Sequence, residues 1–141
     1  MPPKRRPPDD PVEWLNRAIA NLERSKAEIP LTHVYFKDFC FDAQQAAEKA
    51  IKAVLLRLGV RFPYIHDLAD LVDLVTKAGS KIPKAVREAD RLTRFAVVSR
   101  YPGVAEPVTR EEYQRAVKIA EAVVSWAEKQ ITQQKTRKRK S

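Results

Sequence analysis

Apolar residues recur along this chain at intervals of three and four positions, which is the spacing of an amphipathic α-helix. About five such stretches follow one another, separated by short segments that contain proline or glycine. No stretch combines strict alternation of apolar and polar residues with flanking hairpin turns, as a half-buried strand would. Short connections between amphipathic helices favour antiparallel neighbours. The pattern therefore predicts an all-α, up-and-down antiparallel helical bundle of about five helices.

The first predicted helix begins after Asp10. This residue is a suitable N-cap, Pro11 fits the first helical position, and Glu13 places a carboxylate beside the free amides. We expect Pro30 to mark its end. Its apolar positions keep helical spacing and are Trp14, Leu15, Ala18, Ile19 and Leu22.

The second predicted helix is the longest before the C-terminal region, from about His33 to Leu58, and Gly59 follows as a capping residue. Its apolar stripe consists of Phe36, Cys40, Ala43, Ala47, Ala50, Val54 and Leu58. Many of these residues are alanines, whose small side chains let a neighbouring backbone come close. We therefore predict that this helix is the centre of the bundle.

Several polar residues interrupt the second predicted helix, and Gln44, Glu48 and Lys52 lie to one side of its apolar stripe. We interpret Glu48 and Lys49 as ordinary polar residues of a helix surface. The alternative is that they pair with neighbouring charges or line a cleft. Cys40 lies on the apolar stripe itself, and we interpret it as a small core residue.

The third and fourth predicted helices are bounded by turn residues. Asp67 can cap the third, which should end at Gly79, and the fourth should open at Pro83 and reach about Arg100. The core positions expected on the fourth helix are Val86, Ala89, Thr93, Ala96 and Val97.

The fifth predicted helix follows a loop that prolines keep from being helical. It should begin with a capping box, Thr109 to Glu112, and run to about Gln130. The residues that it presents to the core are Tyr113, Ala116, Val117, Ala120, Val123, Val124 and Ala127.

The net charge of +9 is concentrated at the two ends of the chain. Of the 27 Lys and Arg residues, three lie before residue 9 and five lie after residue 134, so residues 11–134 keep 19 of them against 16 Asp and Glu. Such terminal runs cannot bury enough apolar surface to become ordered. We therefore predict a bundle of residues 10–131 between disordered basic tails, residues 1–9 and 132–141. The tails act as solubility extensions or, alternatively, as arms that contact nucleic-acid phosphates.

Other classes of protein are disfavoured by what the sequence contains. A lone cysteine excludes an intrachain disulfide, and with only two histidines we expect no metal site and no cofactor. No apolar run approaches the roughly 20 residues that cross a bilayer, and the charged start lacks the apolar segment of a secretory signal. The expected location is the cytoplasm, with no membrane partner.

Four cations recur at steps of three and four on the predicted fourth helix, which would place them on one face of it. They are Lys84, Arg87, Arg91 and Arg94. Arginine suits phosphate, and Arg100 with Tyr101 lies just beyond, where a ring could stack on a base. We therefore interpret these cations and Arg100 as candidate nucleotide- or RNA-binding residues. A solvated surface and a carboxylate-lined protein interface remain alternatives.

The segment Cys40–Ala50, CFDAQQAAEKA, followed by Phe62-Pro63 and His66-Asp67-Leu68, resembles the hallmark of prokaryotic HEPN (higher eukaryotes and prokaryotes nucleotide-binding) proteins. The other matching positions are Trp14, the run Arg100-Tyr101-Pro102, and Trp126. The resemblance covers roughly residues 10–130. It implies a helical bundle that usually forms a homodimer, often encoded beside a minimal nucleotidyltransferase as one half of a toxin–antitoxin pair. Many members are metal-independent ribonucleases whose site is shared by two protomers.

In those ribonucleases the motif is an arginine followed after four to six residues by a histidine, late in the fourth helix. Here Arg94 matches the arginine, but the residue five further on is Ser99, followed by Arg100 and Tyr101. A serine hydroxyl cannot shuttle a proton near neutral pH as an imidazole can. If the chain is an enzyme of this kind, Arg94, Ser99 and Tyr101 are its candidate catalytic residues.

A second candidate pair is Arg61 and His66, which have the right spacing but the wrong place. They straddle a loop in which Pro63 prevents a continuous helix. We interpret His66 as a residue that helps to start the third predicted helix or hydrogen-bonds across the loop. A nucleotide contact and catalysis are the alternatives.

Three hypotheses follow for the function. The first is a nucleotide- or RNA-binding HEPN domain, without the usual catalytic histidine, that works with a nucleotidyltransferase partner. The second is an active metal-independent HEPN ribonuclease toxin, and the third is a helical protein-interaction module without a nucleic-acid ligand.

Overall fold

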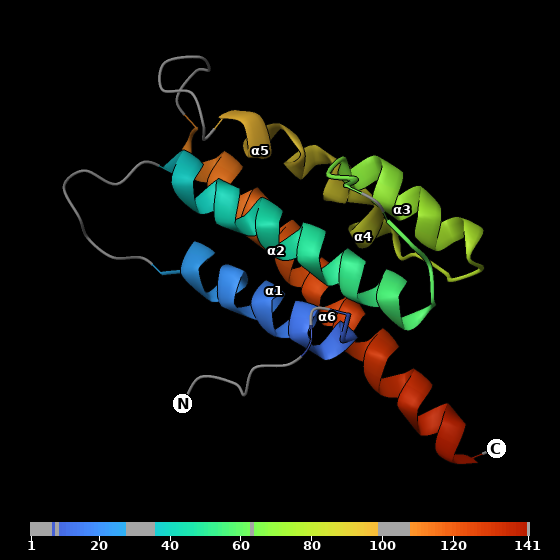
Figure 1. Ribbon diagram of the computed structural model, residues 1–141. Coiled ribbons are helices and arrows are strands. Elements are labelled where there is room, and N and C mark those ends of the chain that lie inside the picture. Colours follow the sequence, from blue (N-terminus) through green and yellow to red (C-terminus); the bar gives the residue numbers. More distant parts are fainter. Residues whose placement is uncertain (1–6, 8, 28–35, 63, 99–107, 141) are drawn as a thin grey trace.

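A computed structural model of the chain describes residues 7, 9–27, 36–62, 64–98 and 108–140, which form helices and no strand (Figure 1). The elements are α1 (Pro11–Ser25), α2 (Phe36–Arg57), α3 (Leu68–Lys77), α4 (Lys84–Arg87), the 3-10 helix η1 (Glu88–Leu92), α5 (Arg94–Val98) and α6 (Arg110–Lys140). The predicted all-α helical bundle is thereby confirmed. None of the helices within these residues is long and apolar enough to cross a bilayer.

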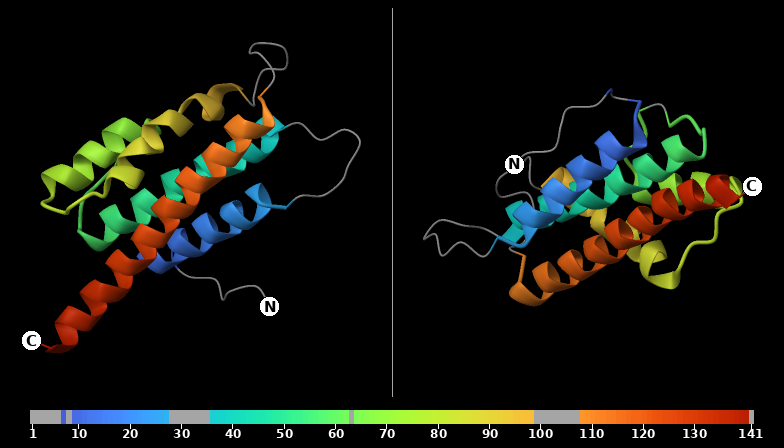
Figure 2. Two further views of the ribbon diagram at one scale, coloured as in Figure 1. Left: turned by 180° about the vertical axis from the view of Figure 1, so that it is seen from behind. Right: turned by 90° about the horizontal axis from the view of Figure 1, so that it is seen from below.

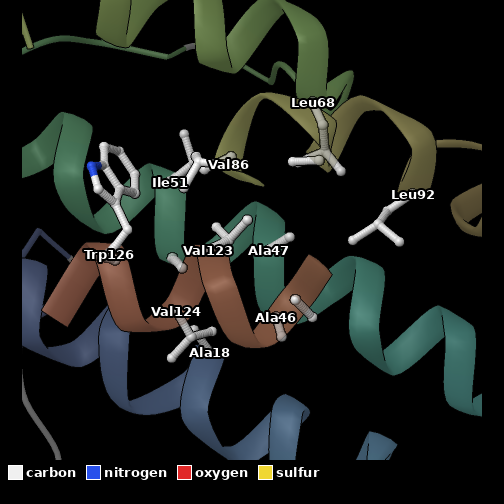
Figure 3. Close-up of a cluster of buried hydrophobic side chains, with 14 of the residues drawn as sticks. Ala18, Ala46, Ala47, Ile51, Leu68, Val86, Leu92, Val123, Val124 and Trp126 are labelled. Carbon is white, nitrogen blue, oxygen red and sulfur yellow. The ribbon is translucent and has the colours of Figure 1, made fainter. Parts of the chain in front are cut away.

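The α2 helix is the centre of the bundle, with α1 and α6 against it, α3, η1 and α5 along another side, and α4 packed against α6 (Figures 1 and 2). Its alanines are fully buried, which lets the neighbouring helices pack closely. In the close-up, Ala47 and Ile51 of α2 lie beside Val123 of α6 (Figure 3). The central position predicted for this helix is therefore confirmed, and Cys40 is fully buried as expected.

Two helix starts follow the predicted side-chain caps. A carboxylate oxygen of Asp10 accepts a hydrogen bond from the Val12 amide at 2.8 Å. In the same way, Asp67 accepts from the Ala69 amide at 2.8 Å. Each bond satisfies an amide that the first helical turn leaves without a partner.

The capping box and the two glycine ends are also confirmed. The Thr109 hydroxyl accepts from the Glu112 amide at 3.1 Å, and the Glu112 carboxylate accepts from the Thr109 amide at 3.3 Å. Gly59 and Gly79 have φ angles of +75° and +90°, in the left-handed region that favours glycine after a helix.

Two helix ends differ from the prediction. The α1 helix ends at Ser25, ahead of Pro30, and the Ser25 hydroxyl donates to the Leu22 carbonyl at 2.7 Å, which caps the last turn. The α6 helix continues past Gln130 to Lys140, because the glutamines and cations beyond it are good helix formers. The boundary between a bundle and a basic C-terminal tail at residue 132 stays a prediction.

The prediction of one continuous fourth helix is wrong, because the chain forms α4, η1 and α5 instead. The buried residues of this segment are Val86, Ala89, Leu92 and Phe95, which recur at every third position. A 3-10 helix has three residues per turn, so it keeps such positions on one face, whereas an α-helix would rotate them away. Leu92 and Phe95 therefore occupy the core, and Thr93 and Ala96 are only partly buried.

Tyr113 ties α6 to the end of α1. Its hydroxyl donates to the Ser25 carbonyl at 2.5 Å, and its ring stacks on Phe36 with centroids 5.2 Å apart. Replacing Tyr113 with phenylalanine should lower the free energy of unfolding by about 1–2 kcal/mol, because the buried hydroxyl donor is lost. Urea unfolding measures this. Tyr64→Phe, at a side chain that is 94% exposed, is the control, and an equal loss in both variants would contradict the assignment.

Candidate functional site

A cleft of about 590 Å³ opens between α6 and the segment formed by η1 and α5. Its lining residues are Glu88, Arg91, Leu92, Arg94, Phe95, Thr109, Glu111, Glu112, Arg115, Ala116, Lys118 and Ile119. This volume lies within the range that small-molecule sites commonly have. The 3-10 segment helps to form one wall, so the break in the predicted fourth helix also shapes the cleft.

Cations line both walls of this cleft around an apolar floor. Arg91 and Arg94 come from the η1–α5 side, while Arg115 and Lys118 come from α6. Within the described part of the chain, Arg91, Arg115 and Lys118 make no ion pair. Three guanidinium or ammonium groups are therefore available to an anion.

Among the described residues, Arg94 is the cleft cation that an ion pair holds in place. Its guanidinium donates to the Glu112 carboxylate at 2.6 Å and lies over the Phe95 ring, 4.7 Å from the centroid. The Thr109 backbone amide, together with the Arg94 guanidinium, holds the pKa of Glu112 below its usual range. Glu112, in the first turn of α6, thus caps that helix and also holds the guanidinium of Arg94 beside the cleft.

Only two of the four cations that the sequence analysis placed on one helix face line the cleft. Arg91 and Arg94 line the cleft, whereas Lys84 and Arg87 are exposed on α4 outside it. The change from α to 3-10 geometry is the reason, because four cations at steps of three and four share one face only on a continuous α-helix. Ser99, Arg100 and Tyr101 lie outside the described residues.

Sequence reasoning missed the two cations that α6 contributes. Arg115 and Lys118 precede the cleft-lining apolar residues Ala116 and Ile119, and the same spacing of three separates both pairs. This places them on the flank of the core face rather than opposite it. The sequence shows that Arg115 and Lys118 lie beside the core face of α6. It does not show which other helix packs next to them.

The second candidate pair, Arg61 and His66, lies between α2 and α3, away from the cleft. His66 is more than half exposed, and its Nδ1 lies 3.1 Å from a carboxylate oxygen of Glu48 on α2. His66 therefore bonds across the loop, which is one of the two structural roles expected for it. Arg61 is exposed.

The interpretation of Glu48 as a surface residue is wrong. Glu48 is 6% exposed and Lys52 is 5% exposed, and their side chains form an ion pair at 3.0 Å. Gln44, also buried, donates to the second carboxylate oxygen at 2.9 Å. Burial opposes ionisation of Glu48, but hydrogen bonds from His66 and Lys52 outweigh it and hold its pKa below the ordinary value.

This buried group of polar side chains is closed by aromatic rings. The Lys52 ammonium lies 5.7 Å from the Trp14 ring centroid and 5.5 Å from that of Phe62. Among the described residues, no group of His, Cys, Asp and Glu side chains is arranged to hold a metal ion. The contacts of Glu48 and Lys52 with their neighbours therefore connect α1, α2 and the loop before α3.

A comparison with known protein families shows to which family this chain belongs. A model of the HEPN domain family matches residues 12–130, which is most of the chain. The chain belongs to the HEPN domain family. Membership in the HEPN family supports a function related to nucleotides or RNA.

Solved structures agree with this assignment to the HEPN family. The crystal structure of TT1696 from Thermus thermophilus is similar over 85% of this chain and 97% of that one, with 28% sequence identity and a TM-score of 0.73. ST0689, described as an archaeal HEPN homologue, is similar over 86% of this chain and 98% of that one, with 25% identity and a TM-score of 0.67. A search of curated proteins finds no match.

Proposed function

We propose that this HEPN domain binds RNA or a nucleotide in the cleft between η1–α5 and α6. The observation that carries the proposal is the set of three cleft cations without an ion-pair partner among the described residues, namely Arg91, Arg115 and Lys118. They surround an apolar floor, so a bound anion would be shielded from part of the solvent. Charge-assisted hydrogen bonds to phosphate are strong in such a setting.

The geometry of Arg94 suits a base as well as a phosphate. Its planar guanidinium is held on one side by Glu112 and lies against Phe95. Unstacked RNA bases commonly stack on aromatic rings and on arginine planes. In this proposal the outer face of Arg94 receives a base, while the free cations on the two walls hold the neighbouring phosphates.

The proposal extends to partners through the family resemblance. The protein acts as a homodimer in the cytoplasm and works with a minimal nucleotidyltransferase as one component of a toxin–antitoxin system. A reducing location suits the lone Cys40, since burial raises the pKa of its thiol to about 12 and keeps it in the unreactive protonated form. Co-purification with the product of a neighbouring nucleotidyltransferase gene would support the pairing.

Photocrosslinking tests the proposed site directly. Single-stranded RNA that carries 4-thiouridine should crosslink to the segments 88–95 and 110–119, which line the cleft, and mass spectrometry of the digested protein would locate the adducts. Crosslinks confined to residues 133–140, or an absence of crosslinks at low salt, would contradict binding in the cleft.

A second candidate function is metal-independent RNA cleavage, and the contact between His66 and Glu48 favours it. The Glu48 carboxylate can only accept a hydrogen bond from Nδ1–H of His66, so Nε2 of the exposed ring is the nitrogen left to act as a base. Pairing of this kind orients many catalytic histidines.

Incubation of mixed RNA with the protein in the presence of a chelator separates the two functions. Under the binding proposal the wild type, Arg94→Ala and His66→Ala all leave the RNA intact. Cleavage by the wild type that either variant loses would sink the non-catalytic account and identify the arginine or histidine responsible.

A further inference from the structure

A second group of cations lies on the surface where α1 and α2 pack side by side, in front of α6 in the view of Figure 1. Arg17 and Arg24 project from α1, and Lys49 projects from α2. Two turns of helix separate the two arginines. These three residues do not line the η1–α5 cleft.

Asn21 connects α1 to α2 at this surface. Its side chain is buried, its amide nitrogen donates to Asp42 at 3.1 Å, and its amide oxygen accepts from the Lys49 ammonium at 2.8 Å. Because the oxygen is an acceptor without charge, this bond orients the ammonium of Lys49 but does not neutralise it.

The carboxylates at this surface contact only the Nε edge of each arginine. Glu13 accepts from Nε of Arg17 at 2.6 Å, and Asp42 accepts from Nε of Arg24 at 3.4 Å. Within the described residues, the two Nη groups of each arginine make no hydrogen bond, and Lys49 has no carboxylate partner. The outer edges of two guanidinium groups and one ammonium are therefore open to a ligand.

The three cations share one surface, because Arg17, Asn21 and Arg24 recur at steps of four and three on α1 and Lys49 donates to Asn21 at 2.8 Å. Burial, followed by the positive charges of Arg24 and Arg17, lowers the pKa of Lys49, and the Glu48 and Asp42 carboxylates offset this only in part. A bound anion would relieve this repulsion. A phosphate monoester carries two negative charges near neutral pH and spreads them over three terminal oxygens, so it matches three cations better than a carboxylate, which carries one.

We propose that the surface between α1 and α2 binds the dianionic phosphate group of a small phosphorylated ligand through Lys49 Nζ and the Nη groups of Arg17 and Arg24. Asn21 and Asp42 act as positioning residues, since Asn21 orients Lys49 and Asp42 holds Arg24. This site is separate from the cleft, and its existence does not depend on the proposed function.

Isothermal titration of the full chain tests the site with inorganic phosphate, glycerol 3-phosphate and adenosine 5′-monophosphate, each against sodium chloride of equal ionic strength. Lys49→Gln should weaken binding of all three about tenfold, because one charge-assisted contact is lost. Lys129→Gln, an exposed change on α6 with the same loss of charge, should leave binding unchanged. Equal losses for the three probes assign recognition to the phosphate group, and tighter binding of the nucleotide extends the site to a nucleoside.

Arg24→Gln is the second variant, since Arg24 is largely exposed and its replacement should not disturb folding. It should also weaken phosphate binding several-fold. Phosphate heats no larger than those of chloride, or full affinity retained in both variants, would overturn the proposal. Neither outcome would affect RNA crosslinking in the cleft. The phosphate site and the RNA-binding cleft can therefore be disproved separately.

Discussion

Replacing Glu48 with glutamine is expected to lower the free energy of unfolding by about 3–5 kcal/mol. The substitution keeps the size of the side chain but leaves the Lys52 ammonium, which is only 5% exposed, without a counter-charge. Urea unfolding followed by circular dichroism measures the loss. Glu128→Gln on the exposed side of α6 removes the same charge and should change the free energy of unfolding by less than about 0.5 kcal/mol.

A double variant distinguishes the effect of charge from that of shape. Glu48→Met combined with Lys52→Met removes both charges and fills the same space with apolar atoms, so most of the stability lost in Glu48→Gln should return. If Glu48→Gln costs less than about 1 kcal/mol, or if the double variant is the less stable of the two, the buried ion pair is not what holds this part of the bundle.

The lowered pKa of Glu48 also predicts how the free energy of unfolding depends on pH. The pKa of Glu48 in the folded protein lies below its ordinary value, so folding favours the ionised form. Its contribution is complete above the ordinary carboxyl pKa and is lost as the pH falls through the lower, folded-state value. The stability of Glu48→Gln should therefore decline less steeply on acidification than that of the wild type, and parallel pH profiles would contradict this.

Reversing two cleft charges, Arg91→Glu with Arg115→Glu, should lower RNA affinity about a hundredfold or more at moderate salt. Each arginine is one of the free cations of the proposed site, and a charge-assisted hydrogen bond contributes about 1.5–3 kcal/mol. Fluorescence anisotropy with labelled single-stranded RNA measures the affinity.

A matched control is available on the neighbouring helix. Lys84→Glu with Arg87→Glu makes the same change in net charge at exposed positions outside the cleft. Its effect should be several-fold smaller, because only long-range attraction is reduced and salt screens it. Equal losses in the two double variants would mean that overall charge, rather than the cleft, attracts RNA.

The parts of the fold that depend on neighbours in the sequence could be predicted. Asp10 and Asp67 cap helices because a side-chain oxygen reaches amides two residues away, and Gly59 ends one because it accepts a positive φ. The alanines of α2 also predicted its central place, since small side chains mark close packing. The segment CFDAQQAAEKA indicated the HEPN family, and the match of the family model over residues 12–130 confirms this.

What could not be predicted depends on segments far apart in the chain. The spacing of Val86, Ala89 and Leu92 fits a 3-10 helix, but the residues of that segment also fit an α-helical pattern, and packing against α2 and α6 decides between them. Glu48 looked like a surface residue because the aromatic rings beside its partner Lys52 belong to Trp14 and Phe62, which lie in other segments of the chain.

The candidate site was predicted only in part for the same reason. One wall of the cleft was expected from the arginines of the predicted fourth helix, and Arg91 and Arg94 do line it. The other wall comes from α6, where Arg115 and Lys118 stand among many cations that the sequence alone does not rank. Only the packing of α6 against η1 and α5 brings the two sets together.

The salt dependence of RNA binding tests the central claim most directly. In single-stranded RNA each phosphate contact contributes about 0.7 to the slope of log affinity against log salt concentration, so Arg91→Gln with Arg115→Gln should reduce that slope by about 1.4. A slope equal to that of the wild type would contradict binding in the cleft and would assign RNA contact to cations elsewhere in the chain.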